Sequence, residues 1–370
     1  MRRLISFRDF DWLLLTFVLI ICSLGVLEIY STTYGTKFAG AHIRQIYWIL
    51  GGLVVMLAVS LINYQVLLEN ANWLYAASVV SLLAVAVFGK KYLGARRWIQ
   101  LPGGQHFQPS EWVKLVLILM LAKHFSGQGE REDASLSEIA KAGLIAGVPM
   151  LLVLKQPDLG TALTYVPVAL MGLFLGGIQF RHAAAILLIA GVLMPTLWIY
   201  GPKMHLIKPY QKDRLTSFLH PEADSQKTGY QLEQSKIAVG SGGIWGKGVR
   251  KGSQTQGSFL PEPHTDFIFA AWSEEHGFVG AVALLLLYFM VLMRLIHNAQ
   301  TAPDSAGGFV VMGVVAVLLF HILVNAGMVV GFMPVTGIPL PLMSYGGSSV
   351  LFMFLALGIV MNIRMRRFVN

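Results

Sequence analysis

Residues 230–280 read YQLEQSKIAVGSGGIWGKGVRKGSQTQGSFLPEPHTDFIFAAWSEEHGFVG. The segment begins as a polar, basic loop that is rich in glycine, and it ends inside an apolar helix. Asp266 lies at the point where the loop enters this helix. Because a carboxylate at the edge of an apolar helix is costly to keep charged, the sequence marks Asp266 as a functional residue.

Outside this segment the chain is dominated by apolar residues. Of its 370 residues, 55% are hydrophobic and only 13% are charged, and the mean hydropathy is +0.63. A water-soluble domain with so few charges could not cover its surface with polar groups, and apolar runs near the ~20 residues needed to cross a bilayer recur along the sequence. The composition therefore predicts an all-α polytopic membrane protein. The single cysteine, Cys22, excludes an intramolecular disulfide.

The apolar runs predict about ten transmembrane helices within one integral-membrane domain, 1–370. Three arginines precede the first run, and three lie at or beyond the end of the last. By the positive-inside rule, both termini are expected in the cytoplasm, and 201–265 becomes a large outer loop between spans seven and eight. The expected spans are roughly 11–31, 44–63, 70–89, 111–125, 137–155, 159–178, 181–200, 266–296, 307–332 and 347–364.

Two outer loops in this topology are basic. The short loop 90–110 carries two lysines and two arginines, Arg96 and Arg97, although the positive-inside rule favours the cytoplasm for such a loop. Either these residues contact anionic lipid headgroups, or they bind an anionic substrate such as a pyrophosphate on the outer face. The longer loop 201–265 carries nine basic and five acidic residues. Because the charge lies on membrane loops rather than on a basic domain, nucleic-acid binding is not expected.

The helices that begin near 111, 159, 266 and 347 all begin on the outer side in this topology. Helix N-termini present N–H groups and a partial positive charge, which suit phosphate groups. Ionisable residues within a membrane face the bundle interior, so we expect the polar residues at these starts to line one outward-opening cavity. The alternatives are local, since an acid at a helix start can simply cap its helix, and Glu111 and Lys114, three residues apart, can pair with each other. The polar residues at these starts include Glu111, Lys114, Gln156, Asp158, His264, Thr265, Asp266, Ser344 and Ser348.

Two other polar segments have more ordinary interpretations. Glu274, Glu275 and His276 begin about 12 Å further along the helix that follows Asp266, so we expect them to be buried structural partners rather than catalysts. The six glycines between 240 and 252 form either a backbone nest for phosphate or a flexible loop, and they lack the spacing of a Walker A motif. The sequence shows no histidine and cysteine cluster with metal-binding spacing.

Six motifs together resemble the SEDS family of bacterial cell-wall polymerases, and they cover nearly the whole chain. The stretches SKIAVGSGG, GSQTQ and GIPLP (337–341) resemble the elongation branch, RodA, more than the division branch, FtsW. One departure is His276, because the resemblance leads us to expect a hydrophobic residue before Gly277. The motifs are GARRWI (94–99), FQPSEWVK (107–114), QPDLGTAL (156–163), YQLEQSKIAVGSGGIWGKG (230–248), FLPEPHTDFIFA (259–270) and PLPLMSYGGSS (339–349).

The resemblance implies a SEDS-type fold and a peptidoglycan glycosyltransferase that polymerises lipid II on the outer face of the bacterial plasma membrane during cell elongation. The donor sugar carries an undecaprenyl pyrophosphate leaving group, and the acceptor is the 4-hydroxyl of an incoming GlcNAc. That hydroxyl is a weak nucleophile, so a general base is needed, and Asp266 is the expected catalytic residue. The leaving group needs positive charge as it departs. The expected substrate-binding residues are Arg96, Arg97, Trp98, Lys114, Gln156, His264, Thr265, Ser344 and Ser348.

The resemblance also implies a cofactor and partners. Glu111 and Asp158 could join Asp266 in holding a divalent cation, Mg²⁺ or Mn²⁺, because oxygen ligands suit these ions. RodA-like proteins work with a class B penicillin-binding protein, a transpeptidase, within the elongation machinery, and Phe289 and Leu292 are candidate lipid-facing contacts for it. Two other functions stay open: a flippase for the lipid-linked precursor, and a non-enzymatic scaffold of the cell-wall machinery.

Overall fold

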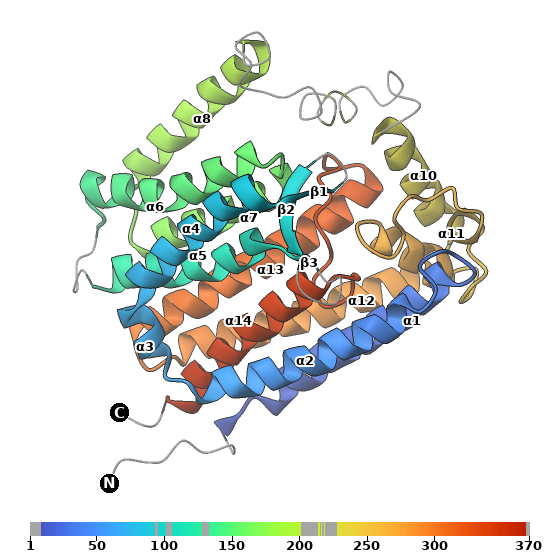
Figure 1. Ribbon diagram of the computed structural model, residues 1–370, viewed down its shortest axis with the longest axis horizontal. Helices are drawn as coiled ribbons and strands as arrows, with labels where there is room; N and C mark the ends of the chain where they lie inside the picture. Colours follow the sequence, from blue (N-terminus) through green and yellow to red (C-terminus); the bar gives the residue numbers. More distant parts are fainter. Residues whose placement is uncertain are drawn as a thin grey trace.

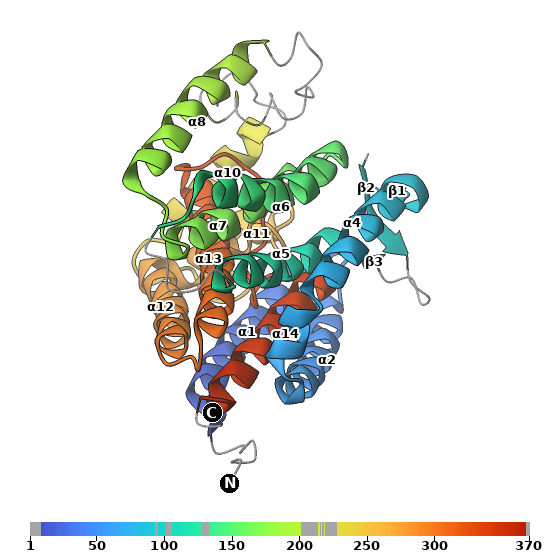
Figure 2. The same cartoon turned by 90° about the vertical axis from the view of Figure 1, so that its left-hand side faces the viewer.

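The computed structural model describes residues 9–92, 95–100, 106–127, 133–200, 214, 216, 218 and 228–367. Within them, long helices lie side by side in one bundle, while α8 stands apart from it (Figures 1 and 2). The helices are α1 (Trp12–Thr33), α2 (Ala41–Leu61), α3 (Tyr64–Glu69), α4 (Ala71–Phe88), α5 (Pro109–Ser126), α6 (Leu136–Lys155), α7 (Leu159–Leu175), α8 (Phe180–Tyr200), α10 (Thr228–Ser241), α11 (Ser253–Gln256), α12 (Ile268–Gln300), α13 (Ser305–Val330) and α14 (Gly347–Met365).

A helix occupies each of the ten ranges that the apolar runs predicted. Seven of the described helices are long and apolar enough to cross a membrane, namely α1, α2, α4, α6, α12, α13 and α14. Helix α7 and residues 180–192 of α8 are apolar but shorter, and α5 carries Glu111, Lys114 and Lys123. The all-α polytopic membrane fold is therefore confirmed, and the count of ten spans stays a prediction.

Helices α13 and α14 lie deep inside the bundle. In their most apolar stretches, 67% of α13 and 78% of α14 is buried, compared with 22% of α4. Small residues let α2 approach α14 closely, because a Cβ at Gly52 would lie 2.4 Å from the Phe354 ring and one at Gly358 would lie 2.8 Å from the Met56 carbonyl oxygen. Close approach at small residues is a main source of helix association in lipid.

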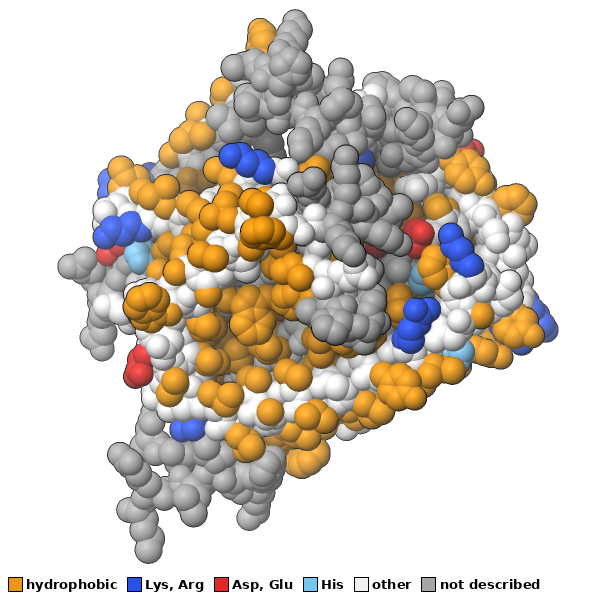
Figure 3. All heavy atoms as spheres, viewed as in Figure 1, with side chains coloured by type: hydrophobic (Ala, Val, Ile, Leu, Met, Phe, Trp, Pro, Cys, Tyr) orange, Lys and Arg blue, Asp and Glu red, His pale blue; other side chains and the backbone are white. Residues whose placement is uncertain are grey.

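The surface of the bundle is apolar along its middle. Figure 3 shows hydrophobic side chains across the visible face, with most of the visible charged side chains toward its two ends. Large apolar residues on this bundle are strongly exposed, among them Tyr47, Trp73 and Phe88. Such a surface suits the hydrocarbon core of a bilayer, with the charged ends in the interfacial regions.

The two ends of the described chain lie together. Arg367 Nη2 is 3.6 Å from Asp9 Oδ1. Nearby, Asp11 caps α1 and receives two hydrogen bonds from Arg294 Nε, both at 2.9 Å, while Arg364 Nη1 lies 3.4 Å away. An even number of membrane crossings returns a chain to the side on which it began, so this contact agrees with the predicted even count.

The loop 90–110 contains a small antiparallel sheet that the sequence did not predict. Its strands are β1 (Lys90–Tyr92), β2 (Ala95–Gln100) and β3 (His106–Phe107). Strand β2 pairs with both others, with Trp98 opposite Lys90 and Ile99 opposite Phe107. The hairpin restrains the backbone of the basic loop next to the start of α5.

The glycine-rich part of the loop 201–265 is held against α12 rather than free. The Lys247 amide donates to the carbonyl oxygen of Glu274 at 3.0 Å, and the Phe278 amide donates to that of Gly243 at 2.8 Å. Between them, Gly277 leaves the helical conformation with φ of 68° and ψ of −165°, which opens α12 to these contacts. The interpretation as a flexible loop is therefore wrong for this part of the segment.

Candidate active site

The starts of α5, α7, α12 and α14 meet, as the sequence predicted. The main-chain amide of Gln108, just before α5, donates to Ser348 Oγ in α14 at 3.3 Å, and its side-chain amide donates to Asp158 Oδ2 at 2.8 Å. The Ser344 hydroxyl, before α14, donates to the carbonyl oxygen of Thr265, before α12, at 2.7 Å. These hydrogen bonds join the polar ends of four helices that are far apart in the sequence.

Asp266 lies half-buried, two residues before α12, against the segment 336–338. The Asn325 side-chain amide holds both segments, because it donates to the carbonyl oxygens of Asp266 and Ile338, each at 2.8 Å. Gly337 has a φ of +73°, and a Cβ there would lie 3.2 Å from Asp266 Oδ2. Glycine is thus favoured both by the backbone conformation and by the space beside the carboxylate. Among the described residues, no side chain forms a hydrogen bond or ion pair with this carboxylate.

Burial raises the pKa of the Asp266 carboxyl to about 6. Burial is the largest cause of this raised value; the negative charges of Glu262 and Asp158 also contribute to it, and the positive charges of Arg214 and Arg97 oppose it. A carboxylate with such a pKa is a stronger base than an ordinary aspartate, and at neutral pH it is still mostly deprotonated. These are the properties required of a general base.

Two arginines lie near this carboxylate. Arg97 Nη1, from β2, is 3.7 Å from Asp158 Oδ1, and Arg97 Nη2 donates to the carbonyl oxygen of Pro157. Arg214 Nη1 donates to the carbonyl oxygen of Thr336 at 2.7 Å. Each guanidinium is held by a backbone carbonyl oxygen, and each is close enough for its charge to lower the pKa of Asp266. A planar guanidinium fork suits phosphate groups.

Two predicted substrate contacts are used inside the protein instead. The Gln156 side chain donates to the carbonyl oxygen of Leu82 at 2.8 Å. Lys114 is fully buried, with its Nζ 2.9 Å from Glu111 Oε2 and 3.3 Å from His321 Nε2. The alternative in which Glu111 and Lys114 pair with each other therefore describes this structure, and neither Lys114 nor Gln156 is placed to touch a substrate.

The other predicted contacts have different positions. His264 is buried, and this burial lowers the pKa of its ring. Thr265 is half-buried, and its hydroxyl donates to the carbonyl oxygen of Glu262 at 3.3 Å. Trp98 is half-buried in the hairpin, and the side chain of Arg96 lies outside the described part of the structure. Substrate binding by these residues, and by the two serines that join the helix starts, stays a prediction.

The three carboxylates predicted to share a divalent cation do not form one ligand set in this conformation. Glu111 is paired with a lysine, and Asp158 caps α7 by accepting hydrogen bonds from the amide and the hydroxyl of Thr161, at 3.2 Å and 3.0 Å. Among the described residues, the one group of three metal-ligating side chains with ligand atoms within 4.8 Å of one another lies elsewhere, on α1 and α12. A three-carboxylate metal site around Asp266 therefore does not fit this structure.

Three residues around Asp266 were missed by reasoning from the sequence. Arg214 is one of nine basic residues in a long loop, and nothing in the sequence distinguishes it from the others. Gly337 lies in the GIPLP run, and nothing in the sequence places this run beside Asp266. Asn325 did carry a usable signal, because a polar residue within an apolar helix is expected to face the bundle interior.

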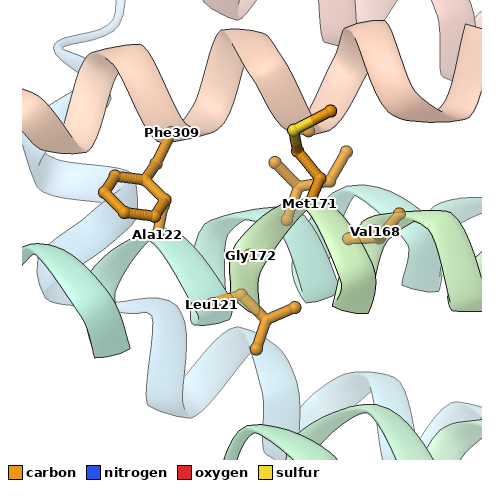
Figure 4. Close-up of a pocket in the computed structure, with 8 residues that line it drawn as sticks. Leu121, Ala122, Val168, Met171, Gly172 and Phe309 are labelled. Atoms are coloured by element: carbon orange, nitrogen blue, oxygen red, sulfur yellow. The ribbon is translucent and has the colours of Figure 1, made fainter. Parts of the chain in front are cut away.

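A small apolar hollow lies between α5, α7 and α13, away from Asp266 (Figure 4). Its lining is apolar and contains no titratable or nucleophilic side chain, so it cannot perform acid–base chemistry. The lining residues are Ile118, Leu121, Ala122, Val168, Met171, Gly172, Phe309 and Gly313.

Comparisons with known proteins agree with the fold and the motifs. The sequence model of the FtsW, RodA and SpoVE family matches residues 11–368 of this chain. The description of this family is cell cycle protein. The peptidoglycan glycosyltransferase RodA of Treponema pallidum is 34% identical over 434 residues, which cover 99% of this chain and 100% of that protein. The peptidoglycan glycosyltransferase MrdB of Escherichia coli is 40% identical over 324 residues, which cover 88% of this chain and 85% of that protein.

Solved structures share the whole architecture. One match is a chain from a peptidoglycan synthase complex that coordinates polymerization and crosslinking. Its TM-score is 0.83 and its identity is 34%, and the match covers 98% of this chain and 99% of that one. The crystal structure of the Rod shape determining protein RodA from Thermus thermophilus matches with a TM-score of 0.71 and 30% identity, covering 97% of this chain and 98% of that one. Because the family model and these relatives match nearly the full length, this chain belongs to the FtsW, RodA and SpoVE family.

Proposed function

We propose that this chain is a RodA-type peptidoglycan glycosyltransferase that polymerises lipid II during cell elongation, with Asp266 as its general base. The enzyme class follows from full-length relatives that are peptidoglycan glycosyltransferases. The assignment of Asp266 is supported by one observation: a half-buried carboxylate with a pKa of about 6, near two arginines, where four helix starts meet.

In the proposed reaction, the 4-hydroxyl of the acceptor GlcNAc donates a hydrogen bond to the Asp266 carboxylate. Asp266 removes the hydroxyl proton while the oxygen forms a bond to the anomeric carbon of the donor. The bond between that carbon and the pyrophosphate oxygen breaks, and its electron pair leaves with undecaprenyl pyrophosphate. Asp266 ends the step protonated and releases the proton to water before the next addition.

Arg97 and Arg214 would stabilise the negative charge that develops on the leaving group. Donors that are held in place before the reaction stabilise such charge without reorganisation, and both arginines are hydrogen-bonded to neighbouring backbone. The N-termini of α7 and α14 add partial positive charge at the same end of the bundle. Arg96, in the same strand as Arg97, is a further candidate for this role.

A divalent cation at this site stays a prediction that rests on the resemblance. Because Glu111 is paired to Lys114, the proposed reaction has no step that depends on an ion. Loss of polymerisation on chelation, restored by Mg²⁺ or Mn²⁺, would support an ion that arrives with the substrate. Full activity in a chelator would exclude it.

We place the site on the outer side of the bacterial plasma membrane and both termini in the cytoplasm. The described chain ends lie together, at the opposite end of the bundle from the β1–β3 sheet and the starts of α12 and α14 (Figure 1). Arginines before the first span and after the last favour the cytoplasm for that end.

We also propose a class B penicillin-binding protein as partner. The support is the likeness to a chain of a peptidoglycan synthase complex. Phe289 on α12 is 57% exposed and suits a contact within the membrane, whereas Leu292 is only 9% exposed. The expectation that both residues face outward is therefore wrong for Leu292, because this position of α12 turns into the bundle.

The purified full-length chain, reconstituted in vesicles with lipid II, tests the function. A polymerase forms glycan strands, a flippase moves lipid II between leaflets without forming strands, and a scaffold does neither. The polar groups around Asp266 are confined to one end of the bundle, which favours the polymerase, because a flippase needs a polar path that continues into the other half of the membrane. Transfer of lipid II without any strand formation would contradict the proposal.

A further inference from the structure

A second cluster of titratable side chains lies outside the candidate active site, where α1 meets α12. Glu28, Glu275 and His276 each place one ligand atom within 4.8 Å of the others. His276 Nδ1 is 3.9 Å from Glu28 Oε2. Glu28 is completely buried and Glu275 is 1% exposed, while the His276 side chain is 24% exposed and offers access from outside.

Among the described residues, the two carboxylates have few hydrogen-bond partners. Neither oxygen of Glu28 has a hydrogen-bond partner among the described residues, and neither does Glu275 Oε2. Glu275 Oε1 alone is engaged, by the Ser31 hydroxyl at 2.5 Å and the Arg250 amide at 3.0 Å. Because burying charged oxygens without partners is costly, a cation or a proton must compensate them.

The basic side chains near this cluster interact with other groups. Lys247 Nζ is 2.7 Å from Glu274 Oε1, and the same carboxylate oxygen accepts a hydrogen bond from the Gln254 amide at 2.8 Å. The Arg250 guanidinium lies 3.4 Å from the centre of the Tyr34 ring. The adjacent acid on α12 is thus fully partnered, in contrast to the pair formed by Glu28 and Glu275.

We propose that Glu28, Glu275 and His276 bind one divalent metal ion of the Zn²⁺ class. An imidazole with two carboxylates suits Zn²⁺ better than Mg²⁺, which prefers oxygen ligands and retains water. Ligand atoms around tetrahedral Zn²⁺ lie about 3.4 Å apart, so small side-chain rotations bring the three ligand atoms from within 4.8 Å to this spacing. Binding through His276 Nδ1 replaces its 3.3 Å contact with the carbonyl oxygen of Trp272.

The ion would connect three elements on the outer side of the bundle. Glu28 belongs to α1, and the other two ligands directly precede the break in α12 at Gly277. The loop that carries Lys247 and Gly248 bonds to the same turn, through amides 3.0 Å and 2.9 Å from the carbonyl oxygens of Glu274 and Glu275. A metal here therefore has a structural role, and it is separate from any ion that the glycosyltransferase reaction needs.

Metal uptake by the purified full-length protein tests the site. The protein is isolated through a tag without histidine, stripped with a chelator and titrated with Zn²⁺, while bound metal and melting temperature are measured. Wild type is expected to retain about one equivalent and to melt several degrees higher with Zn²⁺. Co²⁺ in place of Zn²⁺ should give the visible absorption bands of a low-coordinate site with nitrogen and oxygen ligands.

Two substitutions and one matched control complete the test. Glu28→Gln and His276→Leu should lose the metal, the Co²⁺ bands and the Zn²⁺-dependent rise in melting temperature. His297→Leu removes an exposed histidine from the same helix. This variant should keep the bound metal, the Co²⁺ bands and the Zn²⁺-dependent rise in melting temperature. If Glu28→Gln fails to fold, the partly exposed His276 remains the decisive position. Absence of Zn²⁺ uptake in wild type, or equal uptake in His276→Leu, would overturn the proposal and leave a proton shared by the two carboxylates.

Discussion

Two aspartates at opposite ends of the bundle, Asp11 and Asp266, have opposite surroundings. The Asp11 carboxylate receives two hydrogen bonds from Arg294 and one from Asn298, all at 2.9 Å, and also caps α1 through the amide of Leu14 at 3.1 Å. The Asp266 carboxylate has no such partner among the described residues. Its arginine neighbours instead contact backbone carbonyl oxygens and, in the case of Arg97, the Asp158 carboxylate.

This difference separates an acid that stabilises the fold from an acid that can exchange a proton. A fully paired carboxylate cannot accept a proton without breaking its hydrogen bonds. An unpaired one, with its pKa raised by burial to about 6, can accept a proton from a substrate hydroxyl at neutral pH. We therefore expect substitutions at Asp266 to change catalysis and substitutions at Asp11 to change stability.

Asp266→Asn should reduce lipid II polymerisation by about 10²–10⁴, the usual contribution of a general base. Asparagine preserves the shape and is as good a residue as aspartate at a helix start. Melting temperature and lipid II binding should therefore stay close to those of wild type. Polymerisation within a factor of a few of wild type, at matched protein levels, would contradict the catalytic role.

Asp11→Ala should lower the free energy of unfolding by about 3 kcal/mol, because it leaves two partly buried arginines without their carboxylate. The specific activity of the folded fraction should be unchanged below its melting temperature. Thermal denaturation and activity measured on the same preparation check this. A large loss of specific activity with an unchanged melting temperature would reverse the assignment of the two aspartates.

Gly337→Ala should lower polymerisation roughly tenfold to a hundredfold, since a Cβ 3.2 Å from Asp266 Oδ2 displaces the carboxylate. Gly243→Ala is the matched control, because Gly243 also has a positive φ, of 58°, but a Cβ there meets nothing within 4 Å. Both variants carry backbone strain, and only the first adds a Cβ next to the Asp266 carboxylate. Equal losses of activity in the two variants would show that backbone strain, and not displacement of the Asp266 carboxylate, causes the loss.

Arg214→Gln should raise KM for lipid II several-fold and raise the pKa of Asp266, because this arginine lowers it. Arg181→Gln, which removes an exposed arginine at the start of α8, serves as control. The pH dependence of kcat/KM and the value of KM are measured for both. An unchanged KM in Arg214→Gln would show that Arg214 does not contribute to substrate binding.

The sequence predicted the fold well, because apolar runs of membrane-spanning length need no tertiary information to be recognised. It also predicted that four helix starts meet, since alternating spans place them on one side. The sequence could not show which polar residues at these helix starts form hydrogen bonds or ion pairs inside the protein and which do not. Lys114 and Gln156 were expected to touch substrate and are bound inside the protein, and only the fold brings Glu28 next to Glu275.

The pH dependence of kcat/KM for lipid II polymerisation tests the central claim most directly. A general base acts when deprotonated, so activity in wild type should be full above pH 7 and should fall about tenfold per pH unit below the Asp266 pKa of about 6. The residual activity of Asp266→Asn should show no such fall over the same range. A flat wild-type profile between about pH 5 and pH 7, or the same fall in Asp266→Asn, would contradict Asp266 as the general base.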